Sequence, residues 1–128
     1  MSRPNPVYCA VDTVDLAEAA SLVRQVAEGP RPAVGGIKLG LEFFLAHGAP
    51  GVRYAFPEPV RLTGIGFFLD LKLHDIPNTV AGGIRAVIGL APTYITLHAA
   101  AAGQASAPAR RSPRRRPASS PCRPPRAA

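Results

Sequence analysis

Apolar residues along this chain gather in short runs rich in β-branched and aromatic side chains, separated by stretches with helical spacing. Runs that lack a regular polar alternation are typical of strands buried on both faces. We therefore expect four strands, which cover Val7–Val11, Val34–Leu39, Gly66–Leu69 and Tyr94–Leu97.

The stretches between these runs predict three helices, over Asp15–Glu28, Leu41–Ala46 and Thr79–Ile88. The first places its apolar side chains on one face, and Asp15 followed by Glu18 resembles a capping pair at a helix start. Gly48 is expected to end the second helix and Gly89 the third. Two prolines in the segment 55–61 oppose a regular helix, so we expect a loop there.

The alternation of strands and helices predicts a parallel α/β sheet covered by helices, either open and doubly wound or closed into a barrel. The paired glycines near residues 35 and 65 do not form a dinucleotide-binding fingerprint. Charged or polar side chains end each strand at intervals of 26, 32 and 28 residues, close to one strand–helix unit. Such strand-end groups mark the active face of a TIM-type barrel, so we expect about the first four units of that fold. These strand-end residues are Asp12, Lys38, Asp70 with Lys72, and His98.

The segment FFLDLKLHDIPNT (67–79) brings titratable side chains together at the end of the third strand. Side chains alternate along an extended chain, so Asp70 and Lys72 are expected on the same side, with Asp75 following after a turn. With Lys38 they would form an alternating charge array, in which nearby carboxylates keep Lys72 protonated and able to donate a proton. From spacing alone, a structural ion-pair network is an equally good interpretation.

The motif DLKLHDIPNT (70–79), followed by VAGGIRA, closely resembles the signature of orotidine 5′-phosphate decarboxylases. The Asp-x-Lys-x-x-Asp part alone is shared with sugar-phosphate decarboxylases and aldolases of the same superfamily, and the IPNT continuation favours the orotidylate enzyme. Three other segments agree in order and spacing, so the resemblance covers residues 6–103. These segments are VYCAVD (7–12), GGIKLGLEFFLAHG (35–48) and YITLHAAA (94–101).

The resemblance implies a lyase that decarboxylates orotidine 5′-phosphate to UMP in pyrimidine biosynthesis, without a metal or an organic cofactor. It implies that Lys72 donates the proton to the ring carbon that loses carbon dioxide, and that Asp70 lies beside the departing carboxylate. Lys38 would complete the charge array and touch the ribose, and Asp12 would bind the nucleoside part.

The same resemblance implies a homodimer in which Asp75 and Thr79 reach into the partner's site, whereas His98 is expected to be structural. The implied catalytic residues are Lys72, Asp70, Asp75 and Lys38. The implied substrate-binding residues are Asp12, Lys38, Asp70, Leu71, Lys72, Leu73, His74, Asp75, Ile76, Pro77, Asn78 and Thr79.

Charge and composition divide the chain into residues 1–103, expected to be the N-terminal half of the barrel, and an arginine- and proline-rich tail (104–128). The first part is formally neutral, and the seven arginines of the tail account for the net charge of +7. A segment so poor in apolar residues is expected to be disordered. Our preferred explanation is a shifted reading frame. The alternatives are a basic tail that contacts RNA, DNA or anionic lipid, and a solvated extension without a role.

Other features indicate a soluble, cytoplasmic protein. Cys9 and Cys122 have no metal-binding or redox spacing, and Cys9 is expected to be a small buried hydrophobe. The N-terminus lacks an apolar stretch of signal-peptide length, and the uncharged run 86–103 is broken by polar residues, glycine and proline.

Four strands cannot close a barrel, so we expect the chain as written to be unstable or to associate, with little or no decarboxylase activity. Two other functions stay open at this point. One is a superfamily enzyme for sugar phosphates in which Asp70 and Asp75 hold Mg²⁺. The other is a non-catalytic fragment that associates with nucleic acid through Arg110–Arg126.

Overall fold

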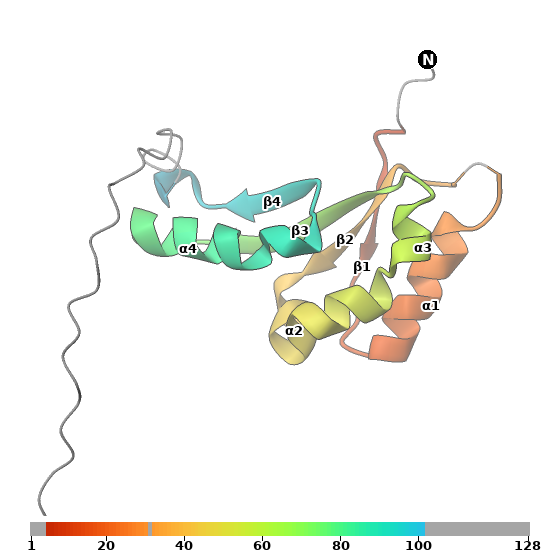
Figure 1. The fold of residues 1–128 in the computed structure, drawn as a ribbon, viewed down its shortest axis with the longest axis horizontal. Helices are drawn as coiled ribbons and strands as arrows, with labels where there is room; N and C mark the ends of the chain where they lie inside the picture. Colours follow the sequence, from red (N-terminus) through yellow and green to blue (C-terminus); the bar gives the residue numbers. More distant parts are fainter. Residues whose placement is uncertain (1–4, 31, 102–128) are drawn as a thin grey trace, which may run out of the picture.

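The computed structural model describes residues 5–30 and 32–101, which form a sheet of parallel strands with helices beside it (Figure 1). The strand order is β1-β2-β3-β4, and each neighbouring pair is parallel. The strands are β1 (Tyr8–Val11), β2 (Gly36–Gly40), β3 (Gly66–Leu73) and β4 (Tyr94–Leu97). The four predicted strands are therefore confirmed. The predictions for residues 104–128, including Cys122, lie outside the described residues.

A connection with helical structure joins each strand to the next. The helices are α1 (Leu16–Ala27), α2 (Leu41–Ala55), α3 (Glu58–Arg61) and α4 (Pro77–Val87), and the short 3₁₀ helix η1 (Ile88–Leu90) follows α4. Figure 1 shows α1, α2 and α3 beside β1 and β2, and α4 beside β3 and β4. Strands that follow one another in space as in sequence, with crossovers of one hand, carry their helices on a single face. This order is that of a TIM-type barrel wall, and it excludes the doubly wound alternative.

The hydrophobic core lies between the sheet and this helical layer. Alternate residues of the two central strands point into it, and Ile37, Leu39 and Leu69 are fully buried there. The rings of Phe56 and Phe67 stack at 5.2 Å between centroids in the same core. The opposite face of the sheet carries Lys38, Phe68, Asp70, Tyr94 and Thr96, and the functional side chains are found there. Cys9 is half-buried and packs against the core.

The predicted capping pair at the start of α1 is confirmed in a modified form. The Asp15 carboxylate accepts a hydrogen bond from the Glu18 amide at 2.7 Å. The Glu18 carboxylate does not return to Asp15 and instead accepts from the Thr13 hydroxyl, which in turn accepts from the Asp15 amide. Two amides, those of Asp15 and Glu18, are thus satisfied by the side chains of Thr13 and Asp15, and the Glu18 carboxylate orients the Thr13 hydroxyl.

One predicted helix end is wrong, and another differs from the structure by a single residue. Gly48 does break the helix, with φ of 61°, but the chain resumes helical geometry at once and α2 continues to Ala55, with Pro50 in the first turn after the break. The third helix, α4, ends at Val87, one residue before the predicted end, and Gly89 follows its C-cap Ile88 within η1. Ala91, with φ of 52°, takes the left-handed position that closes this turn.

The loop expected over 55–61 is also wrong, because α2 reaches Ala55 and residues Glu58–Arg61 form α3. Pro57 is the N-cap of α3, and Pro59 falls within its first turn. Amides in the first turn of a helix have no intrahelical acceptor, so a proline there removes no hydrogen bond.

None of the helices in the described part of the chain has the length and apolar character needed to cross a membrane.

Candidate active site

Four side chains of alternating charge meet at the C-terminal ends of β1, β2 and β3. Lys38 Nζ lies 3.4 Å from Asp12 Oδ1 and 3.9 Å from Asp70 Oδ2. Lys72 Nζ donates a hydrogen bond to the same Asp70 oxygen at 2.7 Å. We call Asp12, Lys38, Asp70 and Lys72 the charge array. The array predicted from spacing consisted of Lys38, Asp70, Lys72 and Asp75. The structure brings the first three together and adds Asp12, which was expected only as a strand-end residue that binds the nucleoside, whereas Asp75 lies outside the array.

Exposure within the charge array is uneven. The side chain of Asp70 is 11% exposed and that of Lys38 is 25% exposed. The outer members are open to solvent, with Lys72 at 71% and Asp12 at 72%. The array thus has a shielded centre and an ammonium group at one end that an incoming molecule can reach.

Asp70 and Lys72 lie on the same side of β3, as predicted, but the strand is not regular between them. The pairing of β3 with β4 is regular at Leu69 and again at Leu73, with a register shift between them. Lys72 has φ of 49°, and Leu71, between the two charged residues, is buried in the core. A bulge of this kind redirects side chains, and here it presents the ammonium of Lys72 to Asp70.

Thr96 of β4 holds this bulge, and sequence reasoning missed it. Its hydroxyl accepts a hydrogen bond from the Lys72 amide at 2.9 Å and donates one to Asp70 Oδ1 at 2.5 Å. The available signal was weak: Thr96 follows Tyr94 by two positions, and so shares the sheet face that carries the charge array.

Asp70 is the electrostatic centre of the site. The hydrogen bond from Lys72 is the largest cause that lowers the pKa of the Asp70 carboxyl, and the hydrogen bond from Thr96 is the next. Burial opposes this effect, while the positive charges of Lys72 and Lys38 reinforce it. Asp70 is therefore a carboxylate at neutral pH.

The remaining residues of the DLKLHDIPNT motif have different surroundings. Asp75 is exposed, and its carboxylate accepts from the Ile76 amide at 2.6 Å, so the structure does not place it in the charge array. The His74 ring stacks on the His98 ring, with centroids 4.1 Å apart. Leu73 packs against the core on the side away from the site. The other candidates Ile76, Pro77, Asn78 and Thr79 lie in the turn and first turn of α4 that follow the array, and Ile76 is exposed.

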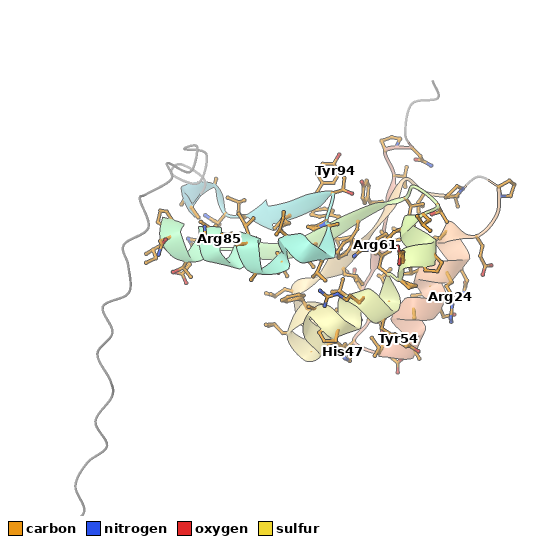
Figure 2. All side chains as sticks on the ribbon, in the orientation of Figure 1. Arg24, His47, Tyr54, Arg61, Arg85 and Tyr94 are labelled. Atoms are coloured by element: carbon orange, nitrogen blue, oxygen red, sulfur yellow. The ribbon has the colours of Figure 1, made fainter. Side chains whose placement is uncertain are left out.

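An aromatic hollow lies on the same sheet face as the array, towards the N-terminal ends of the strands. It is a cavity of about 630 Å³ whose lining includes Tyr8, Phe68 and Tyr94. Figure 2 shows Tyr94 on the side of the sheet away from α2, the helix that carries His47 and Tyr54. Burial and then the charge of Tyr94 raise the pKa of Tyr8.

The position of the Tyr8 side chain requires glycine at two places on the other strands of the sheet. A methyl group on Gly36 would collide with the Tyr8 ring, and one on Gly66 would collide with its hydroxyl group. These glycines let the aromatic side chain lie flat against the sheet.

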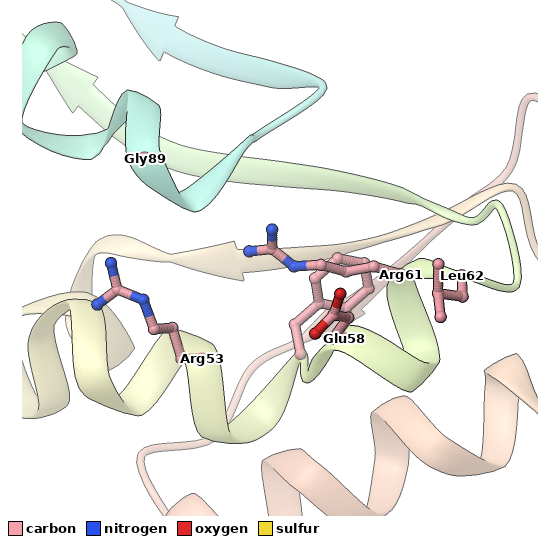
Figure 3. Close-up of a pocket in the computed structure, with 6 residues that line it drawn as sticks. Arg53, Glu58, Arg61, Leu62 and Gly89 are labelled. Carbon is pink, nitrogen blue, oxygen red and sulfur yellow. The ribbon is translucent and has the colours of Figure 1, made fainter.

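A second cavity, of about 370 Å³, lies on the helical side of the fold (Figure 3). Two arginines, Arg53 and Arg61, line it, and Arg61 belongs to the packing of the helices. Arg61 donates a hydrogen bond to the Leu90 carbonyl at 2.5 Å, and its guanidinium lies 5.6 Å from the centre of the Phe56 ring. Arg61 therefore ties α3 to η1 and has no contact with the charge array.

Metal binding has little support in the described residues. No three histidine, cysteine or acidic side chains gather into a candidate metal site within 5–30 and 32–101. In addition, both oxygens of Asp70 already accept hydrogen bonds, from Lys72 and Thr96. The Mg²⁺-dependent alternative required Asp70 as a ligand, so this geometry does not favour it.

Comparison with known proteins identifies one family. The model of the family described as "Orotidine 5'-phosphate decarboxylase / HUMPS family" matches residues 5–116. An orotidine 5′-phosphate decarboxylase of Rhodospirillum rubrum is 48% identical over 95 residues, which are 74% of this chain and 35% of that protein. An enzyme of the same name from Sphingopyxis alaskensis is 51% identical over 75% of this chain and 39% of that protein. Another, from the Wolbachia of Brugia malayi, is 52% identical over 73% of this chain and 38% of that protein. The chain thus spans well under half the length of the relatives it matches.

Proposed function

The chain belongs to the orotidine 5′-phosphate decarboxylase / HUMPS family, and we propose that it serves the decarboxylation of orotidine 5′-phosphate to UMP and carbon dioxide. The observation that supports this most strongly is the charge array, in which a carboxylate shielded from water holds an exposed lysine ammonium at 2.7 Å. The relatives named above are all orotidine 5′-phosphate decarboxylases, and no observation favours a sugar-phosphate substrate.

In the proposed reaction, the bond between the pyrimidine ring and its carboxylate breaks, carbon dioxide leaves, and the electron pair stays on the ring carbon. Lys72 Nζ gives its proton to that carbon and recovers one from solvent. The ammonium stabilises the developing negative charge before the proton moves, which is electrostatic stabilisation by a preorganised group. The proposed reaction uses no metal or organic cofactor.

The other members of the array have distinct roles in this proposal. Asp70 holds the Lys72 ammonium in place and lies beside the substrate carboxylate, where repulsion between the two anions favours loss of carbon dioxide. Lys38 adds its positive charge to the hydrogen bonds from Lys72 and Thr96 that favour the ionised form of Asp70, and it contacts the ribose. Asp12 binds the nucleoside part. Further substrate contacts come from residues 74–79, whereas the side chains of Leu71 and Leu73, which the sequence also suggested, pack in the core and face away from the site.

We also propose a cytoplasmic homodimer in which Asp75 and Thr79 extend into the partner's site. The exposure of Asp75 and its absence from the charge array of its own chain support this arrangement. The 128-residue chain alone should turn over substrate slowly or not at all, because the array stands on an open sheet face in the described structure.

A chimaera tests the proposed function. The 95 residues of the Rhodospirillum rubrum enzyme that match this chain are replaced by the corresponding residues of this chain, and decarboxylation of orotidine 5′-phosphate is followed by absorbance. We expect the chimaera to be active, Lys72→Ala to abolish activity, and Arg53→Ala, which removes a cation near the other cavity, to leave it nearly unchanged.

Two results would contradict the proposal. A folded but inactive chimaera would reject this chain as a source of a working active site. An active Lys72→Ala chimaera would reject Lys72 as the proton donor.

A further inference from the structure

Thr96 occupies an unusual position between β3 and β4. The two strands pair at Leu69 with Ile95 and again at Leu73 with Leu97, so residues 70–72 of β3 face Thr96 alone. Two extra residues on one strand leave backbone groups there without their usual ladder partners. The Thr96 hydroxyl supplies a partner, since it accepts from the Lys72 amide at 2.9 Å.

The chemistry of a hydroxyl group fixes the direction of these bonds. A threonine hydroxyl has one proton to donate and lone pairs to accept with. The Lys72 amide can only donate, so it takes a lone pair of the Thr96 oxygen. The hydroxyl therefore donates its proton in a hydrogen bond to Asp70 Oδ1 at 2.5 Å. A carboxylate accepts this bond better than a carboxylic acid does, so Thr96 favours the ionised form of Asp70.

The same hydroxyl therefore controls two members of the charge array. Through the backbone it holds Lys72 at a φ of 49°, a left-handed conformation that is strained for a residue other than glycine. Through the side chain it orients the carboxylate that receives the Lys72 ammonium at 2.7 Å. The β-branched side chain of threonine also restricts its own rotamer, which a serine at this site would do less well.

We propose that Thr96 is a positioning residue for the charge array, whose hydroxyl holds the bulged backbone of Lys72 and the Asp70 carboxylate in one geometry. The consequence for catalysis rests on the proposed function. The geometric part of the proposal does not, because it concerns only the position and ionisation of groups in this chain.

The test uses the full 128-residue chain and needs no turnover. In Thr96→Val, which keeps the shape but removes the hydroxyl, NMR should show the pKa of the Asp70 carboxyl raised towards its ordinary value. Exchange of the Lys72 amide proton with solvent should accelerate about tenfold, which is the order of one lost hydrogen bond. Thr96→Ser should keep both properties close to those of the unsubstituted chain.

Thr93→Val is the matched control. The Thr93 hydroxyl also accepts a hydrogen bond from a β3 amide, which is that of Phe67, at 3.0 Å, but it contacts no member of the charge array. This substitution should leave Asp70 and Lys72 unchanged. If Thr96→Val does not fold, Thr96→Ala removes the hydroxyl without placing a new methyl group against Asp70 and gives the same two measurements.

The proposal is overturned if removing the Thr96 hydroxyl changes neither measurement, or if Thr93→Val changes both as much. In the active chimaera, Thr96→Val should lower kcat with little change in KM, and Thr96→Ser should restore it. An inactive chimaera combined with the expected NMR result would reject the proposed function and leave the role of Thr96 standing.

Discussion

Replacing Asp70 with asparagine removes the central charge of the array while keeping the size of the side chain. The asparagine oxygen can still accept from Thr96, so the change isolates the interaction with the two lysines. A hydrogen bond to a charged group contributes about 1.5–3 kcal/mol to stability. Because Lys72 is 71% exposed, solvent screening reduces its share to roughly 1 kcal/mol, and Lys38 at 3.9 Å adds less. We expect Asp70→Asn to lower the free energy of unfolding by about 1–2 kcal/mol at pH 7.

The pH dependence of this loss has a definite sign. The pKa of Asp70 is lowered by folding, chiefly by the hydrogen bond from Lys72. The stabilisation is therefore complete above the unfolded pKa and disappears as pH falls through the folded pKa. The difference between the variant and the unsubstituted chain should be constant near neutrality and shrink below about pH 4.

Urea unfolding followed by circular dichroism measures this difference, and urea is preferred to guanidinium because it adds no screening salt. Asp12→Asn is the matched control, since Asp12 is 72% exposed and contacts Lys38 alone at 3.4 Å, so its loss should be below about 0.5 kcal/mol. Equal losses for the two variants, or a loss for Asp70→Asn that does not shrink as the pH falls below about 4, would refute this electrostatic account.

Two further predictions concern the scaffold. Gly36→Ala should destabilise the chain by about 1–3 kcal/mol or prevent folding, because the added methyl group collides with Tyr8. Gly40→Ala should be tolerated, because its methyl group meets no atom within 4 Å. The midpoint of thermal unfolding measures both effects. Asp15→Ala should cost about 1 kcal/mol in urea unfolding through loss of the α1 cap, and Glu18→Gln, which keeps an acceptor for Thr13, should cost much less.

The parts of the fold that the sequence predicted well are those that local signals determine. The apolar runs located all four strands, and Asp15 with Glu18 located the start of α1. The prolines of α3 misled the prediction, because a proline breaks a helix or starts one according to its position. That position depends on where α2 ends, and the chain after Gly48 continues as helix through contacts with the core that no local pattern reveals.

In the candidate site, too, the features set by local sequence were predicted and those set by contacts between strands were missed. The spacing of strand ends predicted the meeting of Asp12, Lys38, Asp70 and Lys72, because parallel strands in sequential order bring their carboxyl ends to one edge. Thr96 was missed because its role depends on a bulge in another strand, 26 residues away in sequence from Asp70. Such a bulge follows from the pairing of two strands and has no signature within either of them.

The backbone at Lys72 bears on the two interpretations of the charge array, catalytic and purely structural, that spacing alone left equal. An array that served stability alone would bury its ion pairs in relaxed backbone. Lys72 instead has a left-handed φ of 49°, which destabilises the fold by about 1–3 kcal/mol. Its side chain is 71% exposed, and an ion pair so exposed stabilises a fold by only about 0–1 kcal/mol. The strained backbone at Lys72 thus destabilises the fold by at least about as much as the Lys72 ion pair stabilises it. Strain of this kind persists where a group must be held ready for a reaction, so the balance favours the catalytic interpretation of the array over the purely structural one.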